Sequence, residues 1–115
     1  MKMKRVLIID DEVLIAFDIE WVLSQAGYDV AAIHTTVGDA LKSIASTEFD
    51  IAILDANLNG ESAEPVAAEL AKRGIPFLGL SGYSSDQRPT SFAGAPFLAK
   101  PFLVDELVSA LRHLA

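Results

Sequence analysis

The chain has 115 residues, of which 51% are hydrophobic and 22% charged, so it is long enough for one domain with a single core. Nine lysines and arginines stand against 16 aspartates and glutamates, and the formal net charge of −7 argues against nucleic acid as the direct ligand. The absence of cysteine excludes disulfides, thiol catalysis and thiolate metal sites. Its apolar runs fall far short of the roughly 20 residues that cross a bilayer. No signal peptide precedes the first run, so we expect a cytoplasmic protein without a membrane partner.

Five short apolar runs alternate with amphipathic stretches along the chain. The runs cover residues 5–9, 30–33, 51–54, 77–80 and 96–99. They are continuous, which is typical of strands covered on both faces in a parallel sheet. Helical patterns lie between and after them, at residues 12–26, 37–46, 64–73 and 104–114. This alternation predicts an α/β fold, a doubly wound five-stranded parallel sheet in a single domain over residues 1–115.

The interval 82–94 breaks this pattern. It has glycine at both ends, a proline in the middle and no apolar stripe. We therefore expect a loop or one poor helical turn there, that is, an irregular or shortened fourth helix.

Polar side chains follow four of the five apolar runs. Asp10 and Asp11 follow the first, Asp55 the third, Ser81 the fourth and Lys100 the fifth. In open parallel sheets, ligands bind beyond the carboxyl ends of the strands, where these side chains would meet. A single acid there could simply be solvated or cap the next helix. Clustered carboxylates repel one another and need a cation, and hard oxygen ligands suit Mg²⁺, so the whole set predicts a phosphoryl and metal site.

Four segments give the chain a resemblance, over nearly its whole length, to the receiver domains of two-component response regulators, which have a flavodoxin-like fold. The segments are Ile8-Ile9-Asp10-Asp11-Glu12, Ile53-Leu54-Asp55-Ala56-Asn57-Leu58, Ser81-Gly82-Tyr83 and Lys100-Pro101-Phe102. Each fragment is weak alone, but the four together, in the family's order and with similar spacing, are specific.

The resemblance implies a phosphoacceptor and a metal site. Asp55 corresponds to the residue that takes a phosphoryl group from a phosphohistidine on a histidine kinase or histidine phosphotransferase. Asp11, Asp55 and the backbone carbonyl of Asn57 correspond to the direct Mg²⁺ ligands, and Asp10 to the residue that holds a coordinated water.

The resemblance also implies a phosphoryl-binding and switching set. Lys100 and Ser81 correspond to the residues that contact phosphoryl oxygens. Pro101 resembles the proline that follows the lysine through a cis peptide bond. Phe97 corresponds to the aromatic side chain that turns inward on phosphorylation, although a static core phenylalanine would explain this position equally well.

Residues 76–83 are similar to the signature of the FAT GUY subgroup of response regulators, many of which are stand-alone domains. Gly79, Leu80 and Ser81 replace the subgroup's Phe, Ala and Thr, so the resemblance is partial. That subgroup lacks a regular fourth helix, in agreement with the interval 82–94. Tyr83 would fill part of the vacated region, gate the site or pack on the surface.

The first helical stretch, 12–26, carries two apolar faces. Leu14, Phe17 and Trp21 lie opposite the face that would pack on a sheet. An exposed apolar patch of this kind often marks a partner surface. The resemblance implies that Leu14 and Trp21, with Ile15 at the border, contact the kinase.

These observations predict a single-domain response regulator without an output domain, which would signal by binding an unknown downstream protein. It could equally serve as a phosphate sink or a relay intermediate. An Asp-dependent Mg²⁺ phosphatase of the haloacid dehalogenase type is the alternative from a different class. That family has an acid two residues after its nucleophile, where this chain has Asn57. We therefore expect no enzyme activity beyond the chain's own phosphorylation and slow dephosphorylation; its oligomeric state stays open.

Overall fold

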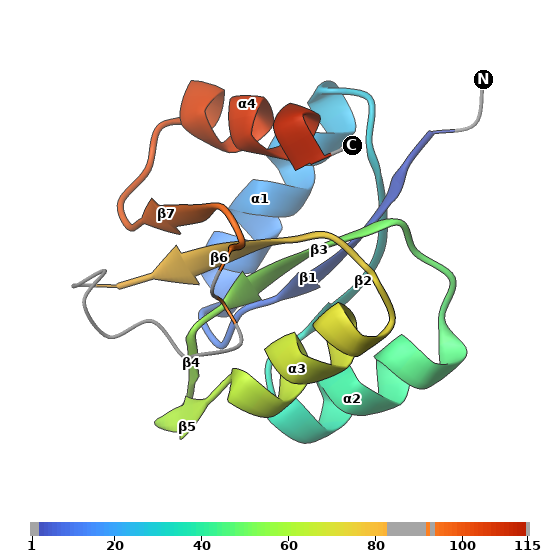
Figure 1. Cartoon of the computed structure of the whole chain (residues 1–115). Coiled ribbons are helices and arrows are strands. Elements are labelled where there is room, and N and C mark those ends of the chain that lie inside the picture. The colour runs from blue at the N-terminus through green and yellow to red at the C-terminus, as the bar shows by residue number, and fades with distance from the viewer. Residues whose placement is uncertain (1–2, 83–91, 93, 115) are drawn as a thin grey trace.

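A computed structural model of the chain describes residues 3–82, 92 and 94–114, and its centre is a five-stranded parallel sheet (Figure 1). The order of the strands in the sheet is β2-β1-β3-β6-β7. Their bounds are Arg5–Ile9 for β1, Asp29–His34 for β2, Ile51–Asp55 for β3, Phe77–Ser81 for β6 and Phe97–Ala99 for β7. The five predicted strands are confirmed, with bounds that differ by one residue at most.

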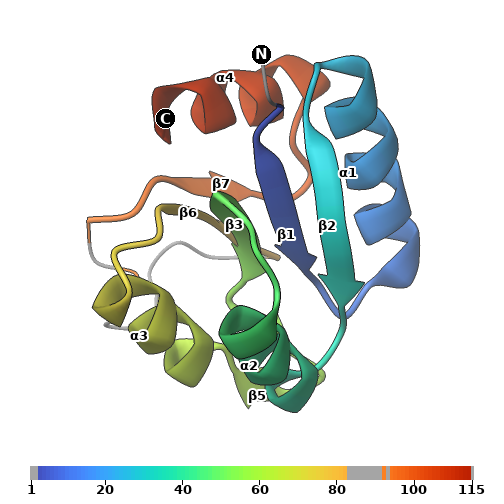
Figure 2. The ribbon, with the colours of Figure 1, turned by 90° about the vertical axis from the view of Figure 1, so that its right-hand side faces the viewer.

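Among the described residues, four helices cover the two faces of this sheet. They are α1 (Val13–Gln25), α2 (Val37–Ser46), α3 (Glu64–Lys72) and α4 (Val104–Leu114). Helices α1 and α4 lie on one face, and α2 and α3 on the other (Figure 2). The predicted doubly wound α/β fold is therefore confirmed.

Apart from Arg5 at the start of β1 and Asp55 at the end of β3, the two central strands are apolar because both of their faces are buried. In β1, Val6 and Ile8 belong to the core on the α1 and α4 side, whereas Leu7 and Ile9 belong to the core on the α2 and α3 side. All residues of β3 are buried as well. This explains why the apolar runs are continuous and not alternating.

Helix ends follow the local sequence signals. Gly27 and Gly74, which follow α1 and α3, have φ angles of 91° and 69°, a left-handed conformation that glycine adopts without steric cost. At the start of α2, the Thr36 hydroxyl accepts a hydrogen bond from the backbone N–H of Asp39 at 3.1 Å. These features mark the ends of α1 and α3 and the start of α2.

A small hairpin was not predicted. Strands β4 (Asn57–Leu58) and β5 (Glu61–Ser62) pair antiparallel directly after β3. Two-residue strands are too short to produce a periodic pattern. The turn between them holds Asn59 and Gly60 at φ angles of 55° and 84°.

The irregular fourth helix and the role of Tyr83 were predicted for a segment that is mostly outside the described residues, so both stay predictions. Within the described ranges, no helix is long and apolar enough to span a membrane.

Candidate functional site

Three strand ends bring charged side chains together at the carboxyl edge of the sheet. Asp10 follows β1, Asp55 ends β3 and Lys100 follows β7. The Lys100 Nζ lies 2.7 Å from Asp55 Oδ2 and 2.9 Å from Asp10 Oδ2. Parallel strands end at the same edge, which is why residues far apart in sequence meet here.

Four carboxylates surround this point. Asp10, Asp11, Glu12 and Asp55 each place one carboxylate oxygen within 4.8 Å of the others. Asp10 is fully buried and Asp55 is 5% exposed. Asp10 Oδ2 forms an ion pair with Lys100 Nζ and has no other hydrogen-bond partner within the described part of the chain. Four carboxylates around a single ammonium group leave an excess of negative charge, and such a cluster of hard oxygen donors fits a divalent cation such as Mg²⁺.

Burial and charge perturb two groups of the site. Burial raises the pKa of Asp10 to about 6, and the neighbouring charge of Asp55 adds to the rise, while Lys100 and the Glu12 backbone N–H oppose it. Burial acts to lower the pKa of Lys100, but hydrogen bonds to Asp55, Asp10 and Glu12 outweigh it and raise that pKa above its usual range. Lys100 is therefore a permanent positive charge at the centre of the cluster.

The β4–β5 hairpin braces two of the carboxylates. The backbone N–H of Asn57 donates to Asp55 Oδ1 at 3.1 Å, and that of Asn59 donates to Asp11 Oδ2 at 3.0 Å. The Asn57 side chain accepts from the Gly60 backbone N–H at 2.9 Å, so it closes the turn. The hairpin thus orients the acids, a role that the sequence patterns did not reveal.

Ser81 and Phe97 lie in the neighbouring strands β6 and β7, and both are half-buried. The backbone carbonyl of Ser81 accepts from the Lys100 N–H at 2.7 Å, which places both residues at the same level of the edge. The Phe97 ring packs edge-on against Phe92, with centroids 5.6 Å apart. The peptide bond between Lys100 and Pro101 is cis.

Glu12 belongs to this site although the sequence analysis assigned it no role. Its Oε1 lies 2.9 Å from Lys100 Nζ, and its side chain is 56% exposed. The sequence does indicate that Glu12 lies near the site, because Glu12 directly follows the two aspartates at the end of β1.

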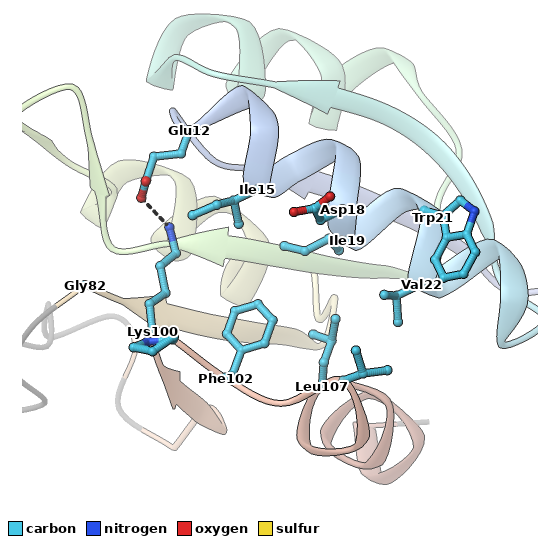
Figure 3. Close-up of a pocket in the computed structure, with 12 residues that line it drawn as sticks. Glu12, Ile15, Asp18, Ile19, Trp21, Val22, Gly82, Lys100, Phe102 and Leu107 are labelled. Carbon is cyan, nitrogen blue, oxygen red and sulfur yellow. Dashed lines mark hydrogen bonds and ion pairs between the residues drawn. The ribbon is translucent and has the colours of Figure 1, made fainter.

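A groove of about 680 Å³ runs from this site between α1 and the segment 100–107 (Figure 3). Glu12 and Lys100 lie at one end of it and Trp21 at the other. Of the residues predicted to contact a kinase, Ile15 and Trp21 line the groove, whereas Leu14, 79% exposed, is outside its lining.

The site and the fold match one known family. The model of the response regulator receiver domain matches residues 6–112, so the chain belongs to this family of two-component signalling domains. Phosphorylation and magnesium binding at an acidic pocket are typical of receiver domains, which interact with histidine kinases or phosphotransferases.

Solved structures and curated proteins include several relatives. The solution structure of SdrG from Sphingomonas melonis Fr1 is 39% identical with a TM-score of 0.87, over 99% of this chain and 98% of that one. TrrA from Thermotoga maritima, in complex with Mg(2+)-BeF, is 31% identical with a TM-score of 0.86, over 98% of this chain and 100% of that one. The transcriptional regulatory protein PdtaR of Mycobacterium tuberculosis is 29% identical over 95% of this chain and 55% of its own length. The chain spans about half the length of the curated relatives it matches.

Proposed function

We propose that Asp55 accepts a phosphoryl group from a phosphohistidine on a histidine kinase or histidine phosphotransferase, and that the aspartyl phosphate changes the binding of a downstream protein. The observation that carries this proposal is the buried Asp55 carboxylate with an oxygen 2.7 Å from Lys100 Nζ, inside an acidic cluster at the end of β3. A carboxylate at this position is an acceptable nucleophile once the charge of the phosphoryl group is neutralised.

The chain's own residues would carry the transfer. A carboxylate oxygen of Asp55 forms the new P–O bond while the P–N bond to the donor histidine breaks, and the electron pair of that bond stays on the imidazole, which takes up a proton. Lys100 balances charge on one phosphoryl oxygen. The Ser81 hydroxyl donates a hydrogen bond to another.

Mg²⁺ would be the cofactor, and it would supply charge neutralisation between the acids and the phosphoryl oxygens. Asp11, Asp55 and the backbone carbonyl of Asn57 would hold it directly, and Asp10 would hold it through a water. The buried Asp10 and Asp55 carboxylates and the oxygen-rich donor set support this proposal. The Mg(2+)-BeF complex of TrrA, a 31% identical receiver, supports it further.

The proposal is tested by the mass of the intact protein after incubation with acetyl phosphate. We expect one added phosphoryl group on the wild-type chain with Mg²⁺, and none after chelation or in Asp55→Asn. An adduct that persists in Asp55→Asn would show that another residue is the acceptor. Continuous release of phosphate far beyond one equivalent would instead indicate the Asp-dependent phosphatase and contradict the assignment as a non-enzymatic signalling domain.

The apolar face of α1 would receive the phosphodonor. Trp21 and Leu14 are 65% and 79% exposed, and Ile15 lines the groove that leads to Lys100. Exposed apolar side chains along the helix that follows Asp11 and Glu12 suit a protein partner. We therefore propose that Leu14, Ile15 and Trp21 contact the kinase or phosphotransferase.

We further propose that residues 1–115 act as a single receiver domain whose output is protein binding, with service as a phosphate sink or relay as the alternatives. The match over 98% of the SdrG chain supports the single-domain form. The mass of the denatured polypeptide from cell extracts tests it, since a fused output domain would give a longer and heavier chain whatever the oligomeric state.

A further inference from the structure

Glu12 contacts Lys100 from the solvent side of the site. Three carboxylates surround the ammonium group, with oxygens 2.7 to 2.9 Å away. Asp10 and Asp55 are buried, whereas the side chain of Glu12 is 56% exposed. Figure 3 shows this contact at the end of the groove. Of the three acids, Glu12 is the one that can return to water with the smallest loss of contacts.

The local structure does not require this contact. Glu12 is the N-cap residue of α1, and its side chain makes no capping hydrogen bond. Ser, Thr, Asp or Asn would serve better as a cap. The carboxylate of Glu12 instead reaches across to a residue 88 positions further along the chain.

We propose that Glu12 competes with the phosphoryl group for Lys100, an inference that rests on the proposed function. In the unphosphorylated protein, Glu12 holds the ammonium group. A phosphoryl group on Asp55 adds negative charge and strong acceptor oxygens beside Lys100. The phosphoryl group then forms the ion pair with Lys100 and repels the Glu12 carboxylate. The Glu12 side chain consequently rotates into solvent. Glu12 therefore weakens phosphoryl binding and is a positioning residue, because it acts through Lys100.

Beryllofluoride, a substitute for the phosphoryl group, provides the first test. Its affinity is measured by calorimetry on the whole chain at saturating Mg²⁺. We expect Glu12→Gln to bind it about two- to fivefold more tightly than wild type, the range given by an exposed ion pair. Glu12→Asp, which keeps the charge but is one methylene shorter, should lie between the two. The gain should shrink at high salt, where exposed charges are screened.

Glu20→Gln is the matched control, since it removes the same charge from an exposed position of α1. It should leave the affinity unchanged. Equal effects of Glu12→Gln and Glu20→Gln would overturn the proposal, and so would weaker beryllofluoride binding by Glu12→Gln. If Glu12→Gln weakens Mg²⁺ binding well beyond Glu20→Gln, Glu12 is a metal ligand and the competition is wrong.

The contact is also tested without metal, by urea unfolding of Glu12→Gln, Lys100→Met and the double variant. We expect the two substitutions to be non-additive, because each removes the same ion pair. Full additivity would contradict the contact. A wild-type chain that binds Mg²⁺ but no beryllofluoride would instead contradict the proposed function, and the competition with it.

Discussion

At the scale of single residues, Asp10 is an acid whose proton binding changes on folding. Its pKa rises from 3.8 to about 6 in the folded protein, chiefly through burial. The folded state therefore binds a proton more tightly than the unfolded state. The resulting stabilisation is fully present below about pH 4 and is lost as the pH rises through about 6. Without a cation, the ionised Asp10 destabilises the fold at neutral pH.

Asp10→Asn should therefore stabilise the metal-free protein at pH 7, by about 1–3 kcal/mol, since one pKa unit corresponds to about 1.4 kcal/mol. The same variant should lose most of the decline in stability between pH 4 and 6. Urea unfolding in the presence of a chelator measures both effects. Asp18→Asn, an exposed acid of α1, is the control and should keep the decline. A metal-free Asp10→Asn less stable than wild type at pH 7 would contradict the argument.

Gly79 in β6 provides the space for two aromatic rings. A Cβ at this position would lie 2.7 Å from Phe92 Cδ2 and closer still to the ring of Phe97. Gly79→Ala must therefore displace the rings or the strand, and we expect a loss of about 1–3 kcal/mol in the free energy of unfolding. If Phe97 is the aromatic residue that turns inward on phosphorylation, the residue at position 79 influences which orientation its ring adopts.

Gly38→Ala is the matched control for this prediction. Gly38 lies in α2, and a Cβ there meets nothing within 4 Å. Alanine is the better helix former, so this variant should be neutral or more stable by up to about 1 kcal/mol. Urea unfolding measures the free energy of unfolding of both variants. A Gly79→Ala protein as stable as Gly38→Ala would contradict the prediction, because it would show that the two rings can move aside without loss of stability.

At the scale of elements, α1 connects the core to the surface proposed to bind the phosphodonor. Ala16, Ile19 and Leu23 are buried on one face, whereas Leu14 and Trp21 are exposed on the other. Both faces follow from the spacing of apolar residues in the sequence. The groove beside the exposed face does not, because it needs the loop before α4 to lie alongside α1.

Trp21→Ala should slow phosphotransfer from the histidine kinase or phosphotransferase that phosphorylates the wild-type chain fastest, by about tenfold or more if Trp21 is an interface hot spot. Phosphorylation by acetyl phosphate should stay unchanged, because Trp21 lies at the far end of the groove from Lys100. Time courses with both donors separate the two effects.

Met3→Ala is the control for this prediction. Met3 is a 51% exposed apolar residue that lies outside α1 and outside the lining of the groove. A Trp21→Ala protein that is folded and has the wild-type rate with the protein donor would contradict docking along the groove.

The strands and helices were predictable because each apolar run or stripe extends over several residues. The β4–β5 hairpin was not, since its strands have two residues each and its stability comes from pairing and from contacts such as that of the Asn59 N–H with Asp11. The sequence around Asn59 and Gly60 does contain a turn signal, but a turn signal alone does not show that an acid lies beside it.

At the scale of the whole molecule, the chain has a negative net charge, and part of that charge is concentrated in the acidic cluster at the edge of the sheet. The formal net charge is −7, and four carboxylates converge within 4.8 Å at one edge. A cation that binds only the folded state stabilises it, by about 2.7 kcal/mol at a concentration 100 times the Kd. We therefore expect Mg²⁺ to raise the Tm of the chain by several degrees, and chelation to reverse the shift.

Calorimetric or fluorescence melts measure this shift, with sodium chloride at the same ionic strength as the control for charge screening. Asp11→Asn should lose the specific part of the response while keeping the part that salt reproduces. A Tm that responds equally to Mg²⁺ and to sodium chloride would argue against a metal site in the cluster.

The sequence by itself determined that Asp10, Asp11, Asp55, Ser81 and Lys100 lie at or just after the carboxyl ends of strands, and the parallel order of the strands then brings them to one edge. It did so because apolar runs and strand ends are local properties of the chain. Only the tertiary structure decided that Glu12 contacts Lys100, that a groove joins this site to Trp21, and that two rings pack over Gly79. Those contacts depend on distances between segments far apart in the chain, which packing of the helices and loops on the sheet sets.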